Sequence, residues 1–153
     1  MNKIIYINND CVFDINKDET LEIYHYVVDK SVNIKINLNG ENAKVIYRLS
    51  IISNNDNVCK VDVNHVTSNT ESKIICHGVN TGNKKLEFNV TGLVSKDISK
   101  CVCKEENQII NLNIFGGSHS TSPEKNYDAF KLSLNLSEII AMNSEFVGLP
   151  RED

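Results

Sequence analysis

The sequence contains no tryptophan and only two prolines, Pro123 and Pro150. A single arginine, Arg48, precedes the last three residues. Without tryptophan to stack on sugar rings, and with so little arginine, neither a carbohydrate site nor a polyanion site is indicated. The formal net charge is −4 and the lysines are spread along the chain, so no basic stripe is present that would release counterions from nucleic acid. We therefore expect no nucleic-acid partner.

Long apolar runs are also missing. The first ten residues hold only the short run Ile4–Ile7, and no segment approaches the ~20 apolar residues of a membrane span. We expect a cytoplasmic protein with no membrane contact. Its five cysteines are an odd number without a secretory signal, which argues against a disulfide framework.

Familiar catalytic motifs are absent from the chain. It has no G-x-S-x-G, no glycine-rich phosphate loop and no H-E-x-x-H. We assign no catalytic residue and expect that the protein is not an enzyme.

Period-2 alternation of apolar and polar residues is the dominant pattern. It runs through Val32–Leu38, Val45–Ile51 and Leu86–Val90, and alternation of this length predicts half-buried β-strands. At 153 residues, 41% of them hydrophobic, the chain is most simply one domain, residues 1–153. The fold class is therefore all-β.

Turn residues separate the alternating stretches. The breaks fall at 39–42, 53–57 and 81–83, and a unit near Glu41 recurs near Asp56 after about fifteen residues. Asparagine makes up about one residue in seven, and it tolerates left-handed backbone at turns; codon bias would explain the same excess. Residues 97–107 interrupt the alternation, and 116–126 is predicted to be an exposed loop. These patterns alone suit a β-sandwich and a β-solenoid equally.

Two stretches, residues 65–82 and 127–150, together resemble the core domain of the SufB and SufD proteins of iron–sulfur cluster assembly. The second stretch follows the family order of Asp-Ala, a polar run, Asn-Leu-x-Leu-Ser and a late Pro. The distance from Gly92 to Asp128 is longer than in the family, which leaves the register of residues 93–126 open. The matching positions are His65, Asn69, Thr70, Ser72, Gly78, Gly82, Asp128, Ala129, Asn135, Leu136, Ser137 and Pro150.

This resemblance implies a right-handed parallel β-helix, with the β-sandwich as the alternative. It also implies a scaffold or interaction component of cluster assembly, because the chain stops where the family's cluster-building strands and C-terminal helices would begin. We expect no cofactor in the isolated protein, and an iron–sulfur cluster only in a complex. The expected partner is a SufB-like protein or a second copy of the chain, bound through C-terminal strands that include Leu132, Leu134 and Leu136.

Four residues are candidates for a metal site. Cys101 and Cys103 are spaced to share one face of a strand, and Cys76 and His77 could add ligands, although no C-x-x-C or H-x₃-H half completes the set. The simpler interpretation is that Cys76 is a buried core residue that only packs, and that His77 points outward from its strand. Cys101 and Cys103 could instead form a surface dithiol between two lysines. The alternative functions are therefore a metal- or thiol-handling protein, or an unrelated all-β binding module.

The remaining histidine of interest is His65. We expect it to cap a turn between coils by bonding backbone groups, rather than to take part in chemistry.

Overall fold

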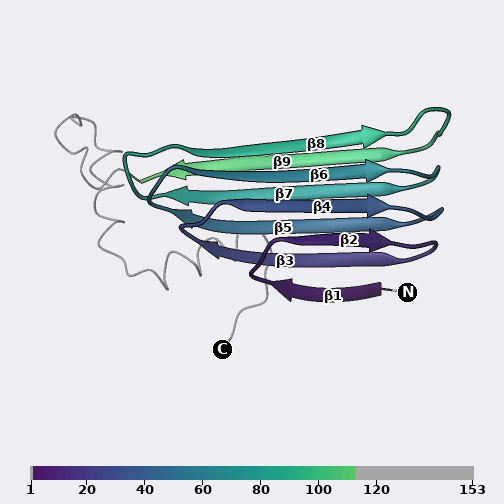
Figure 1. The fold of residues 1–153 in the computed structure, drawn as a ribbon, viewed down its shortest axis with the longest axis horizontal. Helices are drawn as coiled ribbons and strands as arrows, with labels where there is room; N and C mark the ends of the chain where they lie inside the picture. The colour runs from purple at the N-terminus through teal and green to yellow at the C-terminus, as the bar shows by residue number, and fades with distance from the viewer. Residues whose placement is uncertain (1, 113–153) are drawn as a thin grey trace.

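The chain winds into a solenoid of about four coils, each built from two β-strands (Figure 1). The structure is a computed structural model that describes residues 2–112. Within that range it contains strands and turns and no helix. The strands are β1 (Asn2–Ile7), β2 (Cys11–Ile15), β3 (Thr20–Val28), β4 (Val32–Leu38), β5 (Lys44–Ser53), β6 (Asn57–His65), β7 (Glu71–Asn80), β8 (Leu86–Val94) and β9 (Val102–Asn111).

Every strand pair is parallel. Odd-numbered strands form sheet A in the order β1-β3-β5-β7-β9, and even-numbered strands form sheet B in the order β2-β4-β6-β8. The chain therefore crosses from one sheet to the other at every turn, so consecutive strands do not pair with each other. The β-solenoid prediction is confirmed. A sandwich of antiparallel hairpins is not the fold of these residues.

The repeat seen near Glu41 and Asp56 is half of a coil. The first unit leads into β5 of sheet A and the second into β6 of sheet B. A full coil takes two such units, so Asn37 stacks on Asn64, 27 residues later. Sequence similarity at the shorter spacing reflects two sheets with the same strand-and-turn design.

The core is the space between the two sheets, and the alternation decides which side chains enter it. Ile34 and Ile36 of β4 and Tyr47 and Leu49 of β5 are all fully buried, which confirms the predicted inward rows. Burying one such side chain contributes about 1.5–3 kcal/mol, so these stacked rows are the main source of stability.

Asparagine and aspartate occupy the places where the solenoid needs them. On the outer face of sheet B, Asn64 Nδ2 donates to Asn37 Oδ1 at 2.8 Å, and Asn37 Nδ2 donates to Asp14 Oδ1 at 2.9 Å. This ladder ties three coils together. At another turn, Asp29 accepts bonds from the backbone of Asn54 and Asn55, which lower the pKa of its carboxyl.

A left-handed residue precedes each of four strands in sheet A by two positions. These residues are Asp18, Asn42, Asn69 and Lys100, with φ between 58° and 63°. Three of the four are Asp or Asn, which adopt this conformation with the least strain after glycine. The backbone requirement of this turn thus accounts for two of the asparagines, Asn42 and Asn69.

Strand β9 differs from the sequence expectation. Residues 97–107 were predicted to interrupt the strands, but only 95–101 do so, and Val102–Asn111 pairs with β7 over its whole length. The strand escaped detection because Cys103, Glu105 and Asn107, which continue the inward rows, are polar and leave no apolar alternation. The predicted loop at 116–126 and the predicted interface residues Leu132, Leu134 and Leu136 lie outside the described residues.

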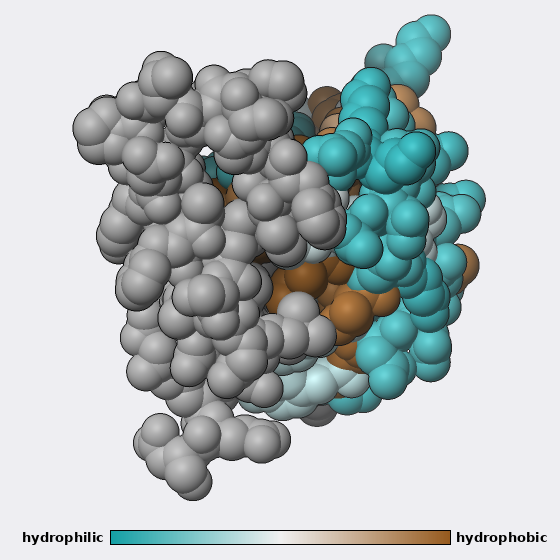
Figure 2. All heavy atoms as spheres, turned by 90° about the vertical axis from the view of Figure 1, so that its left-hand side faces the viewer, coloured by the Kyte–Doolittle hydropathy of each residue, from teal (hydrophilic) through white to brown (hydrophobic). Residues whose placement is uncertain are grey.

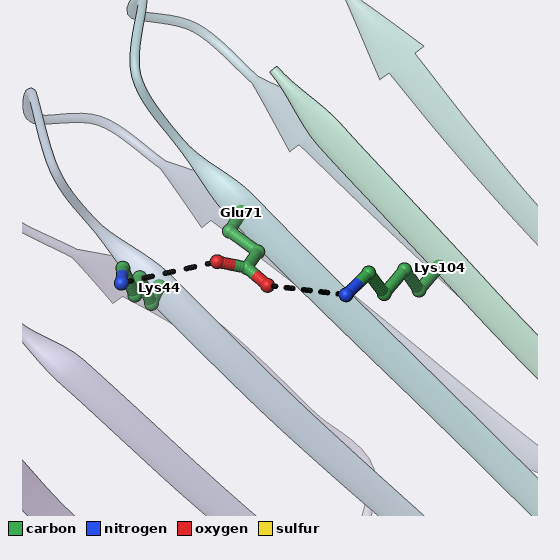
Figure 3. A network of polar contacts seen from close by, with 3 residues as sticks. All are labelled: Lys44, Glu71 and Lys104. Carbon is green, nitrogen blue, oxygen red and sulfur yellow. Dashed lines mark ion pairs between the residues drawn. The ribbon is translucent and has the colours of Figure 1, made fainter. Parts of the chain in front are cut away.

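The outer face of sheet A carries charged pairs near the start of its strands. The carboxylate of Glu71 on β7 lies between the ammonium groups of Lys44 on β5, at 3.8 Å, and Lys104 on β9, at 4.0 Å (Figure 3). These side chains are 37–61% exposed, so each pair stabilises the fold by less than about 1 kcal/mol. On the face where the strands of sheet A end, most of the described surface is hydrophilic, and a hydrophobic area borders the grey atoms (Figure 2). No helix that could cross a membrane is found among residues 2–112.

Candidate functional site

The candidate site lies at the corner where sheet B turns into sheet A, at the right of Figure 1. Three inward positions define this corner in each coil: the last residue of the sheet B strand, the residue before the sheet A strand, and the second residue of that strand. In one coil they are Leu38, Ala43 and Val45. In the next coil they are His65, Thr70 and Ser72. In the last described coil they are Val94, Cys101 and Cys103.

The stacking of coils makes this comparison an internal control. Leu38, Ala43 and Val45 are buried and apolar, as a solenoid core requires. One coil later the same corner is polar although it is equally buried, since His65, Thr70 and Ser72 are at most 2% exposed. Burial of polar groups costs free energy unless they are hydrogen-bonded, so this corner must satisfy them internally.

His65 is the centre of the bonding. Its Nδ1 lies 2.7 Å from Thr70 Oγ1, and its Nε2 lies 3.0 Å from Ser72 Oγ and 3.1 Å from Cys103 Sγ. We call these residues, with Cys101, the His65 corner. The expectation that His65 bonds backbone groups is not what the geometry shows, because its ring contacts three side chains, those of Thr70, Ser72 and Cys103.

The tautomer of His65 follows from Thr70. The Thr70 hydroxyl donates its proton to the carbonyl oxygen of Thr67 at 3.0 Å, so toward the imidazole it acts as an acceptor. We infer that Nδ1 of His65 carries the hydrogen, so that Nε2 presents its lone pair to Ser72 and Cys103. Burial lowers the pKa of His65, which favours this neutral form.

The two cysteines occupy different environments within the corner. Cys103 is exposed, and its sulfur contacts the Nε2 lone pair. Cys101 is half-buried, and its sulfur lies 3.4 Å from Thr70 Oγ1 and 3.6 Å from the Thr67 carbonyl oxygen. Only Cys103 therefore faces a base.

Backbone bonds hold the corner in place. Val102 N donates to the Thr70 carbonyl at 3.0 Å, and Ser95 N donates to the His65 carbonyl at 3.0 Å. Cys101 and Cys103 flank Val102 and are thus fixed above Thr70 and Ser72 by the parallel ladder. This part of the site is built on strands rather than on a loose loop, which favours a defined geometry.

The predicted metal candidates do not all come together. Cys101 and Cys103 belong to the His65 corner, whereas Cys76 is fully buried between the sheets and His77 lies on the opposite face of β7, 3.8 Å from Glu106. Burial raises the pKa of Cys76 and lowers that of His77. Among residues 2–112, no group of three or more His, Cys, Asp or Glu side chains is close enough to hold a metal ion.

Sequence reasoning missed the contact between His65 and Cys103, which are 38 residues apart. A signal did exist in the corner positions, because the apolar Val45 is followed by Ser72 and then by Cys103 in consecutive coils. Finding it requires the register, and the register requires knowing that the sheets are parallel.

A second buried polar pair lies deeper in the core. His25 Nδ1 and Tyr47 Oη are 2.8 Å apart, and their side chains are 1% and 0% exposed. Burial lowers the pKa of His25 to about 4 and raises that of Tyr47. Because neither group reaches solvent, the pair is a structural element and not a site for a ligand.

Comparisons with known proteins add no relative. No family model matches the chain, and no curated protein and no solved structure matches it.

Proposed function

We propose that this chain is a SufB/SufD-like scaffold component of iron–sulfur cluster assembly, which binds a SufB-like protein or a second copy of itself. The fold supports the proposal because a β-solenoid is the architecture that the resemblance implies. The His65 corner supports it further, because Thr70 and Ser72 are both hydrogen-bonded to His65, and all three are positions that match the family pattern.

Other matching positions also have structural roles near this coil. Asn69 adopts the left-handed conformation of the turn, and Gly78 lies where a Cβ would come within 2.6 Å of Leu86. The motif thus describes how one coil is built, which is what a shared framework would preserve. On this proposal the chain supplies a framework and a partner surface.

Association through strand edges is the physical basis of the partner proposal. Within residues 2–112, β8 pairs only with β6 and β9 only with β7, so each leaves one edge without a strand neighbour. An edge of this kind can accept another strand. Since the net charge is small, the association should depend only weakly on salt.

Capture from the source cell under anaerobic conditions tests this function. The bait is the tagged chain, and the matched control is the same chain with Leu93→Asp, which alters an exposed side chain at the end of edge strand β8. We expect recovery of a SufB-like protein, or of the untagged chain, with the first bait and less with the second. A monomer at high micromolar concentration, together with no SufB-like protein in the eluate, would reject the proposal.

A second function, thiol handling by Cys103, is favoured by one specific observation. Its exposed sulfur lies 3.1 Å from a buried imidazole nitrogen that presents a lone pair. A nucleophile beside a base that is held by a third group is the arrangement expected of an activated thiol. This arrangement favours thiol chemistry over the metal-handling alternative.

A further inference from the structure

We propose that Cys103 is a nucleophilic thiol that exchanges with low-molecular-weight disulfides, with His65 as the group that takes and returns its proton. The inference rests on the second function above and is independent of the partner proposed first.

The first step of the argument is proton transfer. Neutral His65 holds its hydrogen on Nδ1, bonded to Thr70, so Nε2 is free to accept the proton of Cys103 Sγ across 3.1 Å. Transfer leaves a thiolate on Cys103 and an imidazolium whose Nδ1–H still donates to Thr70. Thr70 acts here as a positioning residue, because it fixes the ring orientation and the tautomer.

The second step is the exchange itself. The Cys103 thiolate attacks one sulfur of a disulfide R–S–S–R, a new S–S bond forms, and the original S–S bond breaks. The leaving sulfur takes the proton from His65 Nε2 and departs as R–SH, so His65 returns to its neutral form. The products are a mixed disulfide on Cys103 and one free thiol, with no net change in protons or electrons.

The surroundings of Cys103 suit a disulfide substrate. Thiol–disulfide exchange needs a thiolate, open space beside it and a proton for the leaving group. Gly92 leaves room for about a methyl group beside the sulfur, because an added Cβ would lie in ordinary contact with Cys103 Sγ at 3.6 Å. Beside it, Val94 stacks on His65 in the ladder and is 51% exposed, which offers an apolar contact to an incoming substituent.

Ser72 gives the arrangement a distinctive property. Its hydroxyl lies 3.0 Å from the same Nε2 atom that Cys103 contacts, so the two donors compete for one lone pair. Removing the hydroxyl should leave Nε2 to Cys103 alone. A group that matters only for packing would give the opposite result, because its removal would loosen the corner.

Kinetics with dithiobis-nitrobenzoate, a disulfide whose released thiolate is coloured, test the proposal on the purified chain. We expect one fast-reacting thiol, lost in Cys103→Ser and retained in Cys101→Ser. In His65→Gln, Cys103 should react about a hundredfold more slowly, the lower end of what a positioned general acid–base supplies. In Ser72→Ala it should react as fast as in the wild type or faster. Mass spectrometry after incubation with oxidised glutathione should place the adduct on Cys103.

The pH profile separates the role of His65 from a change in folding. Among residues 2–112, the titratable side chain near His65 and Cys103 is that of Cys101, which contacts Thr70. The ladder neighbours of His65, Leu38 and Val94, are apolar. The rate for Cys103 should be level between pH 7 and 8, because His65 is already neutral there. Free cysteine, measured in parallel as an unassisted thiol, should instead react up to tenfold faster per pH unit as it ionises near ~8.5.

Three results would overturn the inference. A Cys103 rate that rises with pH as steeply as that of free cysteine would do so, and so would a Ser72→Ala variant as slow as His65→Gln. A fast phase that persists in His65→Gln would remove His65 from the mechanism while leaving thiol handling by Cys103 in place. None of these results bears on the scaffold function, which the capture experiment reports separately.

Discussion

The buried pair of His25 and Tyr47 makes the stability of the solenoid depend on pH. The folded pKa of His25 is about 4, against 6.5 for the free side chain, because burial disfavours the charged ring. Between these values the unfolded chain binds a proton that the folded chain does not. The stabilisation from neutral His25 is therefore complete above pH 6.5 and is lost as the pH falls toward 4.

The size of the effect follows from the two pKa values. Over the whole range it amounts to about 3 kcal/mol, and going from pH 7.5 to pH 5.0 it amounts to about 2 kcal/mol. The lowered pKa values of His65 and His77 add to it with the same sign. A loss of about 2 kcal/mol is a large part of the stability of an ordinary domain.

Urea unfolding at the two pH values measures this difference. The informative variant is His25→Leu with Tyr47→Phe, which removes both polar groups and leaves no orphaned partner in the core. Its free energy of unfolding should fall by about 2 kcal/mol less than that of the wild type between pH 7.5 and 5.0. If the wild type and the variant lose the same free energy, His25 is not the buried neutral group described here.

Three further predictions concern the turns and the cofactor content. Gly40→Ala should lower the free energy of unfolding in urea by about 1–3 kcal/mol, because a Cβ there would lie 2.1 Å from the backbone nitrogen of Lys17. The control variant Gly92→Ala should change it by less than about 1 kcal/mol, because its Cβ would meet only ordinary contacts. Equal effects would contradict the described packing. Lys100→Asn should raise the free energy of unfolding by about 1 kcal/mol, because asparagine adopts the left-handed conformation of this position with less strain than lysine. The control variant Lys96→Asn should not. Equal melting temperatures for the two variants would count against this turn geometry. The chain purified alone should contain no stoichiometric iron–sulfur cluster by iron analysis and absorbance, and a reconstituted cluster that survives desalting would promote metal handling.

The strands with clear alternation could be predicted from the sequence. Val32, Ile34 and Ile36 face the core as their spacing indicates, and the turn residues near Gly40 separate the strands as expected. The parallel pairing was a different matter, because alternation is the same in a sandwich and in a solenoid. It was the resemblance to a β-helical family that favoured the correct fold.

Strand β9 and the site could not be predicted, for a related reason. The inward row of β9 is polar at Cys103 and Glu105, so the hydrophobic pattern fails where the solenoid departs from a plain apolar core. The spacing of Cys101 and Cys103 suggested a shared partner, but the sulfurs contact different atoms. The partner of Cys103 is His65, and only the stacking of coils brings that residue to it.

Nitrogen-15 NMR of the His65 ring tests the central claim most directly, because the proposed chemistry depends on which ring nitrogen carries the proton. At pH 7.5 the folded chain should show a neutral ring with its hydrogen on Nδ1, and Thr70→Val should release that preference. A hydrogen on Nε2, or a protonated ring at this pH, would mean that Nε2 cannot accept the proton of Cys103, and would contradict the account of the His65 corner.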